Sequence, residues 1–367
     1  SAKALFPGPE PGKPDLKLGD IGLWVMDDGS YATLHGAPIQ NPWVRLLWDL
    51  KPGSSQLEVD LSAAGWTAGS EILITSWDNP DWIELRRVDS IQGNRITLES
   101  PATYFHPGRR YAYNKTTQAL RLLGAAESPL SGEVLVPHQC EAALLTRNLT
   151  IASDLSRGKG KAHTLAMMGG GYRIAYTQLK DIGPRQQKGP FGRYPLHLHR
   201  IGESQGIALT GNALWNSFLP GHQGIVLHDT NGASVNNNLV YNVQGPPIDT
   251  ERATEARNVI QKNLLVNFFT PDPTPQDDLA ARFSYVAGFT AGIWVRPGNT
   301  IQDNVILLGQ AGAAGLGMTS TTLSPAPGAA TISGNTLRAN SLGLVFFGSK
   351  LSAEFKDGVL AANTRGL

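Results

Sequence analysis

From Ile21 onward, the hydrophobic residues come in short runs that turn residues separate. Each run holds four to eight residues rich in Val, Ile, Leu and Trp, and signals such as Asp-Asp-Gly, Pro-Gly-Ser and Gln-Gly-Asn divide them. Runs of this length and composition predict β-strands. No sustained stripe with the 3.6-residue period of an amphipathic helix interrupts them. The pattern therefore predicts a β-rich domain over residues 21–130, preceded by an extended arm over the Pro- and Gly-rich residues 1–20.

A second pattern begins near residue 145, where an asparagine is followed by two or three apolar residues and a turn. It recurs at Asn148, Asn212, Asn238, Asn263, Asn304 and Asn335. The successive spacings from Asn212 are 26, 25, 41 and 31 residues, as expected for coils of a parallel β-helix, some with insertions. Hydrogen bonds between stacked asparagines would offset the cost of burying their amides. We expect the β-helix over residues 131–350 and a tail or cap over 351–367; unrelated turns in a β-sandwich are the alternative.

Composition narrows the classes of partner. The formal net charge is +1, so no global field attracts nucleic acid or an anionic membrane. No apolar run reaches the length of a membrane span, and no signal peptide stands at the N-terminus. Cys140 is the only cysteine, which excludes disulfides within the chain and a CxxC metal site. We expect a soluble protein without a nucleic-acid partner or a membrane span.

The segment Gly192-Arg193-Tyr194-Pro195-Leu196-His197-Leu198-His199-Arg200 carries the strongest chemical signal. If its second half is a strand, His197 and His199 point to the same face, because side chains alternate with period two. Neutral imidazoles bind metals or accept protons, and the flanking arginines, Arg193 and Arg200, suit a carboxylate. The alternative is that both histidines are polar surface residues of a half-buried strand.

Three motifs identify a family resemblance. They are Leu144-Leu145-Thr146-Arg147-Asn148, the string from Gly192 to His199, and Leu227-His228-Asp229-Thr230-Asn231-Gly232. On these residues the sequence resembles the cell-migration-inducing hyaluronidase family and its bacterial relatives, over roughly residues 25–345. The resemblance implies an all-β fold, a right-handed parallel β-helix preceded by a smaller domain named for its eight glycines, which we expect to cap the first coil. The chain departs from the family at Pro246, where relatives carry histidine, and at Gln223, where they tend to carry arginine.

Stacked coils predict a site with both histidines and carboxylates. His197 and His199, then His228, and then the segment of Asp249, Glu251 and Glu255 fall on successive coils, with His163 one coil earlier. Predicted catalytic residues are His197, His199, Arg193, Glu251 and Glu255; predicted substrate-binding residues are Arg200, Arg252 and Arg257; predicted metal ligands are His163, His197, His199 and His228. Histidine ligands favour Zn²⁺, whereas a carboxylate cluster would favour Ca²⁺. A solvated turn between coils is the alternative for the glutamates and their neighbouring arginines.

Function follows from this inventory and from the resemblance. We expect a depolymerase acting on a uronate-containing, hyaluronan-like polysaccharide, secreted or at the cell surface, monomeric and without an organic cofactor. In hydrolysis, Glu251 or Glu255 would protonate the leaving oxygen. In β-elimination, a histidine or arginine would remove the proton next to the uronate carboxylate. A non-catalytic, polysaccharide-binding β-helix is the third possibility.

Overall fold

The computed structural model describes most of the chain. The described residues are 2–7, 22–27, 29–60, 65–124, 127–155, 161–184, 192–204, 206–217, 220–251, 255–270, 290–310, 312–319, 329–347 and 353–363. They divide into two compact units, residues 1–37 with 147–367 and residues 38–146. Each unit is described by itself below.

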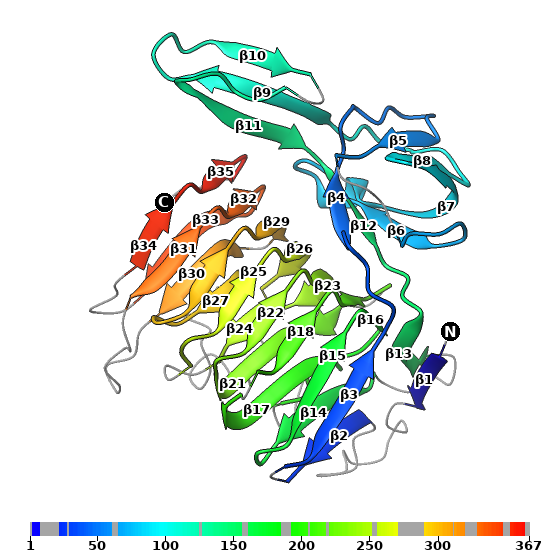
Figure 1. Ribbon diagram of the computed structural model, residues 1–367, viewed down its shortest axis with the longest axis vertical. Coiled ribbons are helices and arrows are strands. Elements are labelled where there is room, and N and C mark those ends of the chain that lie inside the picture. Colours follow the sequence, from blue (N-terminus) through cyan, green and yellow to red (C-terminus); the bar gives the residue numbers. More distant parts are fainter. Residues whose placement is uncertain are drawn as a thin grey trace. The chain divides into compact units, whose positions relative to one another are not determined.

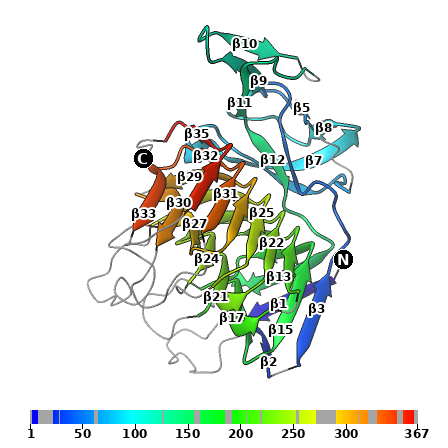
Figure 2. The ribbon, with the colours of Figure 1, turned by 60° about the vertical axis from the view of Figure 1, so that its left-hand side comes forward.

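The larger unit is a right-handed parallel β-helix built from three parallel sheets (Figures 1 and 2). In pairing order, the first sheet consists of β1 (Ala2–Pro7), β13 (Leu149–Asp154), β16 (Thr177–Lys180), β19 (Ala213–Trp215), β23 (Leu239–Gln244), β26 (Leu264–Phe269), β29 (Val305–Gln310), β32 (Thr336–Arg338) and β35 (Val359–Ala361), with β20 (Gly221–His222) pairing with β23. The second consists of β2 (Gly22–Met26), β14 (His163–Met167), β17 (Leu196–Glu203), β21 (Ile225–Asn231), β24 (Ile248–Thr250), β27 (Ala291–Val295), β30 (Ala314–Thr319) and β33 (Leu342–Phe347). The third consists of β3 (Tyr31–His35), β15 (Gly171–Ala175), β18 (Ala208–Thr210), β22 (Ser234–Asn236), β25 (Val259–Gln261), β28 (Thr300–Gln302), β31 (Ala330–Ser333) and β34 (Ala353–Lys356).

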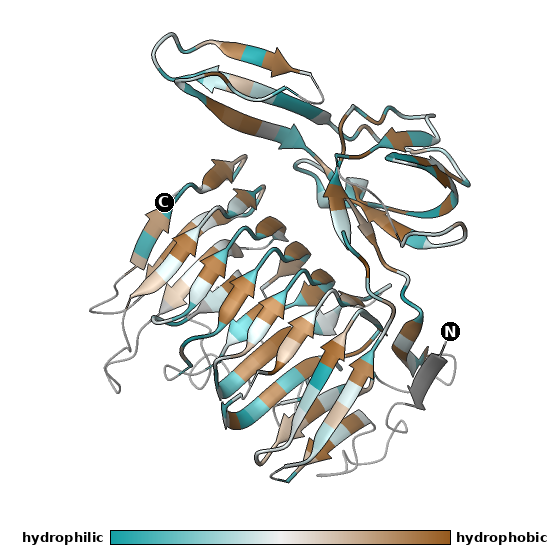
Figure 3. Ribbon diagram, viewed as in Figure 1, coloured by the Kyte–Doolittle hydropathy of each residue, from teal (hydrophilic) through white to brown (hydrophobic). Residues whose placement is uncertain are grey.

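Apolar rows in register form the core of the β-helix. In the third sheet one row runs through Ile174, Leu209, Val235, Ile260, Ile301 and Ile332, all fully buried. Hydrophobic and hydrophilic bands alternate along the strands (Figure 3), because every second side chain points inward. Burial of these branched side chains, at about 1.5–3 kcal/mol each, is the main term that holds the coils together.

The predicted asparagine ladder is present. The Nδ2 atom of Asn212 donates to Oδ1 of Asn238 at 3.0 Å, and the same bond links each further pair through Asn263 and Asn304 to Asn335. Each of the four donors also gives its second amide hydrogen to a backbone carbonyl, at 2.8 to 3.0 Å. The repeat read from the sequence therefore marks one corner of the stacked coils. Stacked coils are a feature of a β-helix and not of a β-sandwich.

The domain boundaries differ from those expected. The first coil is built from β1, β2 and β3, which pair in parallel with β13, β14 and β15. The segment 1–20, predicted as an arm, thus contributes a strand of the β-helix, and its residues 8–20 lie outside the described ranges. At the other end, β34 and β35 extend the stacks beyond residue 350. The β-helix is therefore formed by the two chain segments on either side of an inserted unit. Capping of the first coil by that unit stays a prediction.

The inserted unit, residues 38–146, contains antiparallel sheets. One has the order β4 (Trp43–Arg45), β12 (Glu141–Leu144), β6 (Glu71–Ile74), β7 (Glu84–Gln92), β8 (Arg95–Leu98) and β5 (Gln56–Glu58), and the other β10 (Leu120–Leu123), β9 (Gly108–Asn114) and β11 (Glu133–Gln139). The unit also contains a 3₁₀ turn, η1 (Pro80–Trp82). None of the described segments has the length and hydrophobicity of a membrane-spanning helix.

Candidate functional site

The predicted histidines lie on the outer face of the second sheet. Leu198 of β17 and Leu227 of β21 are paired and belong to the core, so the residues on either side of each point outward. His199 pairs with His228 across β17 and β21. The register of β21 with β24 pairs Leu227 with Thr250, which brings Glu251 next to His228. The order predicted from stacked coils is therefore present on one face.

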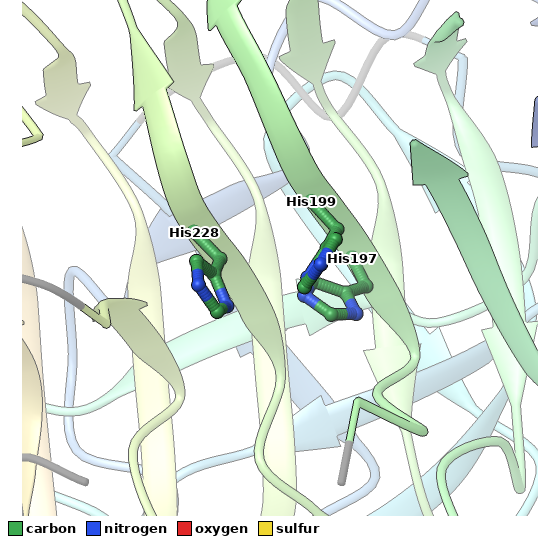
Figure 4. A group of neighbouring side chains, drawn as sticks. All are labelled: His197, His199 and His228. Carbon is green, nitrogen blue, oxygen red and sulfur yellow. The ribbon is translucent and has the colours of Figure 1, made fainter. Parts of the chain in front are cut away.

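His197, His199 and His228 form a cluster (Figure 4). One ring nitrogen from each lies within 4.8 Å of those of the other two. The ring centroids of His199 and His228 are 4.4 Å apart, and those of His197 and His199 are 5.0 Å apart. The chain bends beside the cluster, where the register of β17 shifts between His199 and Gly202 and Arg200 has a φ of 54°. An irregularity of this kind re-aims side chains at the edge of a site.

Hydrogen bonds orient two of the three rings. His197 Nδ1 donates to the carbonyl oxygen of Gly192 at 2.8 Å, and His228 Nδ1 lies 2.7 Å from Oε2 of Glu251. The Nε2 atoms of both rings, and Nδ1 of His199, are buried without a hydrogen-bond partner among the described residues. His228 Nε2 has a carboxylate oxygen of Asp229 at 3.6 Å, which is too long for a hydrogen bond. Both oriented rings therefore carry their proton on Nδ1.

His197 and His228 are buried, and His199 is half-buried. Burial lowers the pKa of His197 to about 3, against the opposing charge of Glu251, and lowers the pKa of His199 to about 4. Both rings are neutral at pH 7, which suits a metal ligand and makes each a weak general base. Burial acts to raise the pKa of Glu251, but the hydrogen bond from His228 and the nearby histidines and Tyr194 outweigh it, so its pKa lies below the usual range.

A second carboxyl group on the same face behaves in the opposite way. Asp249 stands two residues before Glu251 on β24 and is buried. Burial, followed by the negative charge of Glu251, raises the pKa of Asp249 well above its usual value, although Arg296 opposes the shift. Arg296 is itself buried, and its Nη2 donates to the Glu251 carbonyl oxygen at 3.3 Å. Asp249 therefore keeps its proton to a higher pH than an ordinary aspartate does, whereas Glu251 beside it ionises at a lower pH than an ordinary glutamate.

The other predicted site residues have different surroundings. Glu255 is buried, and its Oε1 accepts a hydrogen bond from the backbone N–H of Asp229 at 2.9 Å. Arg193 is buried, and its charge helps to lower the pKa of His163. Arg200 is largely exposed, with its Nε 3.7 Å from Asp229 Oδ2.

Two of the predicted residues stand apart. Arg257 is exposed and forms an ion pair with Glu203 rather than with a group of the site. Arg252 lies outside the described residues. Gln223, where the sequence departs from the family, is buried. Its backbone N–H donates a hydrogen bond to the carbonyl oxygen of Gln244.

His163 is not part of the cluster, so the prediction of four histidine ligands is wrong for this residue. β14 and β17 pair Ala166 with Leu198 and Met167 with His199, which puts His163 four residues away from the row that contains His199. Its Nε2 accepts a hydrogen bond from Trp24 Nε1 at 3.0 Å. The described residues hold a three-histidine site.

Three functional candidates had no role assigned from the sequence. Tyr194 Oη donates to Oε1 of Glu251 at 3.0 Å; its position inside the Gly-Arg-Tyr-Pro string was the available signal. Asp249 shares a face with Glu251, as their spacing of two implies. Arg296 comes 45 residues after Glu251 along the chain, and no local pattern marks it.

The sequence of the β-helix matches a known family. Residues 160–341 match the family model described as CEMIP beta-helix. A G8 domain-containing protein of Dictyostelium discoideum is 23% identical over 251 residues, which cover 67% of this chain and 19% of that protein. Fibrocystin-L of Mus musculus is 26% identical over 304 residues, 74% of this chain and 7% of that protein. The chain thus spans a fifth or less of the length of these relatives.

Among solved structures, the tailspike protein gp49 of Pseudomonas phage LKA1 aligns over 92% of this chain and 63% of its own, with 10% identity and a TM-score of 0.28. The Gp54 tailspike of Acinetobacter baumannii bacteriophage AP22, solved in complex with a capsular saccharide, aligns over 94% of this chain and 68% of its own, with 11% identity and a TM-score of 0.20. The match to the family model contains all three clustered histidines and their carboxylate partner. The resemblance predicted from the motifs is confirmed, and residues 160–341 belong to the CEMIP β-helix family.

Proposed function

We propose that this chain is a depolymerase that hydrolyses an acidic, uronate-containing polysaccharide of the hyaluronan type. The observation that supports hydrolysis is the pair Asp249 and Glu251, two carboxyl groups on one buried face whose pKa values move in opposite directions. Two titratable groups whose surroundings push their pKa values apart are the usual signature of an acid and its partner carboxylate. Residues i and i+2 of a strand stand about 6.5–7 Å apart along it, which leaves room for a sugar or a water between them.

The roles differ from those expected from the sequence alone. Glu251 was a predicted proton donor, yet it is ionised and accepts hydrogen bonds from Tyr194 and His228. Burial and the charge of Glu251 raise the pKa of Asp249, so we assign to it the protonation of the leaving glycosidic oxygen. Glu251 supplies the negative charge that faces the oxocarbenium-like transition state and keeps His228 in one tautomer.

The choice of substrate rests on the family and on nearby cations. The family name denotes hyaluronidase activity, and uronate polymers carry one carboxylate in each repeat. Arg200 has an exposed side chain beside the cluster, and a guanidinium binds a carboxylate through paired hydrogen bonds. Such polymers lie outside cells, so we propose that the protein acts at the cell surface or in the medium.

The test incubates the protein with each of five polymers: hyaluronan, chondroitin, pectate, alginate and a neutral glucan. Two quantities are measured, the size of the products and the absorbance of unsaturated uronates. We expect shortening of a uronate polymer without that absorbance. The Asp249→Asn variant should lose at least about 100-fold in rate, while Glu203→Gln, an exposed carboxylate paired with Arg257, should retain full activity. Shortening with the absorbance would replace hydrolysis by β-elimination, and binding without shortening would indicate a non-catalytic module.

A further inference from the structure

We propose that His197, His199 and His228 bind one divalent transition-metal ion of the zinc class. The inference concerns the site of the proposed function and extends it to a cofactor, but its test does not depend on activity. Three imidazole nitrogens from two adjacent strands lie within 4.8 Å of one another. Nitrogens bound tetrahedrally at about 2.0–2.1 Å from one zinc ion are about 3.4 Å apart, so small rotations of the rings suffice to close the site.

Unpaired buried nitrogens are the first supporting observation. His197 Nε2, His199 Nδ1 and His228 Nε2 are all buried without a hydrogen-bond partner among the described residues. Leaving one such atom unsatisfied costs about 1–3 kcal/mol, and most buried polar side-chain atoms in proteins do have a partner. Three unsatisfied nitrogens in one cluster are accounted for together if all of them bind the same ion.

The partners of the two Nδ1 atoms are the second observation. Metal-binding imidazoles donate their other N–H to a carbonyl or a carboxylate, which fixes the tautomer and the ring orientation. His197 donates to the Gly192 carbonyl and His228 faces Glu251 in this way. Gly192 has a φ of 105°, and a Cβ on it would lie 3.3 Å from His197 Cε1. Only glycine readily adopts that conformation and leaves room for the ring.

The donor set selects the type of ion. Imidazole nitrogens suit Zn²⁺, Co²⁺ and related ions, whereas Ca²⁺ and Mg²⁺ require oxygen ligands. Glu251, the nearest carboxylate, already accepts hydrogen bonds from Tyr194 and pairs with His228. Three protein ligands leave a position for water or substrate, as in catalytic zinc sites. A bound ion of this class would lower the pKa of a water or polarise a substrate oxygen.

Two titrations of chelator-treated protein test the proposal. Co²⁺ binding is measured by visible absorbance, and Zn²⁺ binding is measured by calorimetry. We expect one ion per chain, displacement of Co²⁺ by Zn²⁺, and no competition from Ca²⁺. Alanine at His197, His199 or His228 should weaken binding by at least 100-fold. The matched control is His163→Gln, a change on the same sheet outside the cluster that keeps an acceptor for Trp24, and it should bind as tightly as the wild type.

Two results would overturn the proposal. One is folded wild-type protein, judged by circular dichroism, that binds neither ion below millimolar concentration. The other is His163→Gln weakening binding as much as the cluster variants do. If an alanine variant fails to fold, Glu251→Gln replaces it; this change keeps side-chain volume and should weaken binding 10- to 100-fold, and unchanged affinity would count against the site. Asp249→Asn separates the two proposals, because it should abolish hydrolysis and still bind the metal.

Discussion

Nδ1 of His228 lies 2.7 Å from Oε2 of Glu251, and the other oxygen of that carboxylate accepts a hydrogen bond from Tyr194. The three side chains come from β21, from the residue after β24 and from the turn before β17. The carboxylate therefore fixes one imidazole and is itself fixed by the phenol. This chain of contacts makes Tyr194 a positioning residue that acts on the histidine cluster through Glu251.

Removal of the Tyr194 hydroxyl should weaken metal binding modestly. Tyr194→Phe takes one hydrogen bond from the Glu251 carboxylate, which is worth about 1 kcal/mol, so we expect roughly a fivefold loss of Co²⁺ affinity and a shift of its visible bands. Tyr241→Phe, which changes a half-buried tyrosine of β23 in the first sheet, is the matched control. Equal Co²⁺ spectra and affinities for Tyr194→Phe and wild type would show that the phenol does not orient the site.

The buried carboxyl group of Asp249 should make stability fall as pH rises. Its folded-state pKa is raised well above the ordinary value by burial and by Glu251, so the folded protein holds this proton more tightly than the unfolded chain does. Above the unfolded pKa of about 3.9, the folded state binds more protons, and the free energy of unfolding decreases with pH until the folded pKa is passed. The Asp249→Asn variant lacks this loss.

Urea unfolding of chelator-treated wild type and Asp249→Asn at several pH values measures the effect. We expect the variant to gain stability steadily on the wild type between pH 4 and pH 8, with each unit of pKa shift worth about 1.4 kcal/mol. Glu203→Gln, which changes an exposed carboxylate, should show no such trend. A difference between Asp249→Asn and wild type that stays constant with pH would mean that Asp249 is ionised in the folded protein.

Arg200 and Arg257 should differ in their effect on substrate binding, although both were predicted to hold substrate. Arg200 adjoins His199 in sequence and its charge contributes to the lowered pKa of that histidine, whereas Arg257 pairs with Glu203 at an exposed position. We expect Arg200→Ala to raise KM for a uronate polymer about tenfold, the equivalent of 1.4 kcal/mol, and Arg257→Ala to leave KM unchanged. Initial rates over a range of polymer concentrations measure both, and equal KM values for the two variants would contradict the assignment.

The sequence predicted the fold of the chain better than its boundaries. The asparagine spacing is a direct consequence of coil length, so the repeat from Asn212 to Asn335 located the β-helix. The strands Gly22–Met26 and Tyr31–His35 belong to the same β-helix, yet the inserted residues 38–146 separate them from their neighbours. Nothing in a local hydrophobic pattern tells a strand of the first coil from a strand of the inserted domain, because both have a period of two.

The histidine cluster was predictable for a similar reason, and its limits follow from register. His199 and His228 are one coil apart, and His197 shares the face of His199, so spacing alone brought three of the four predicted ligands together. Which residue of β14 lies beside His199 depends on the pairing register, and that residue is Met167 rather than His163. The protonation states of Asp249 and Glu251 depend on burial and on tertiary contacts, which a sequence pattern does not contain.

The β-helix should fold without the inserted unit. Gly36 N–H donates to the Ala175 carbonyl at 2.9 Å, and Ala37 N–H donates to Asn148 Oδ1 at 2.6 Å, so the chain leaves and re-enters the larger unit at neighbouring points. A Cβ on Gly36 would lie 2.0 Å from the Tyr176 carbonyl oxygen, which explains the glycine at the exit. A Gly/Ser linker of about five residues in place of 38–146 closes a short loop at small entropic cost.

We expect this deletion variant to be soluble, to keep the far-UV circular dichroism of parallel β-structure, and to bind Co²⁺ as the full chain does, since all three histidine ligands lie in the larger unit. In a matched deletion, the same linker replaces residues 207–231, starting directly before β18 of the third sheet. This change removes most of one coil and should abolish cooperative unfolding. Aggregation or loss of cooperative unfolding in the 38–146 deletion would show that the β-helix depends on contacts with the inserted unit, and metal binding would then have to be measured on the full chain alone.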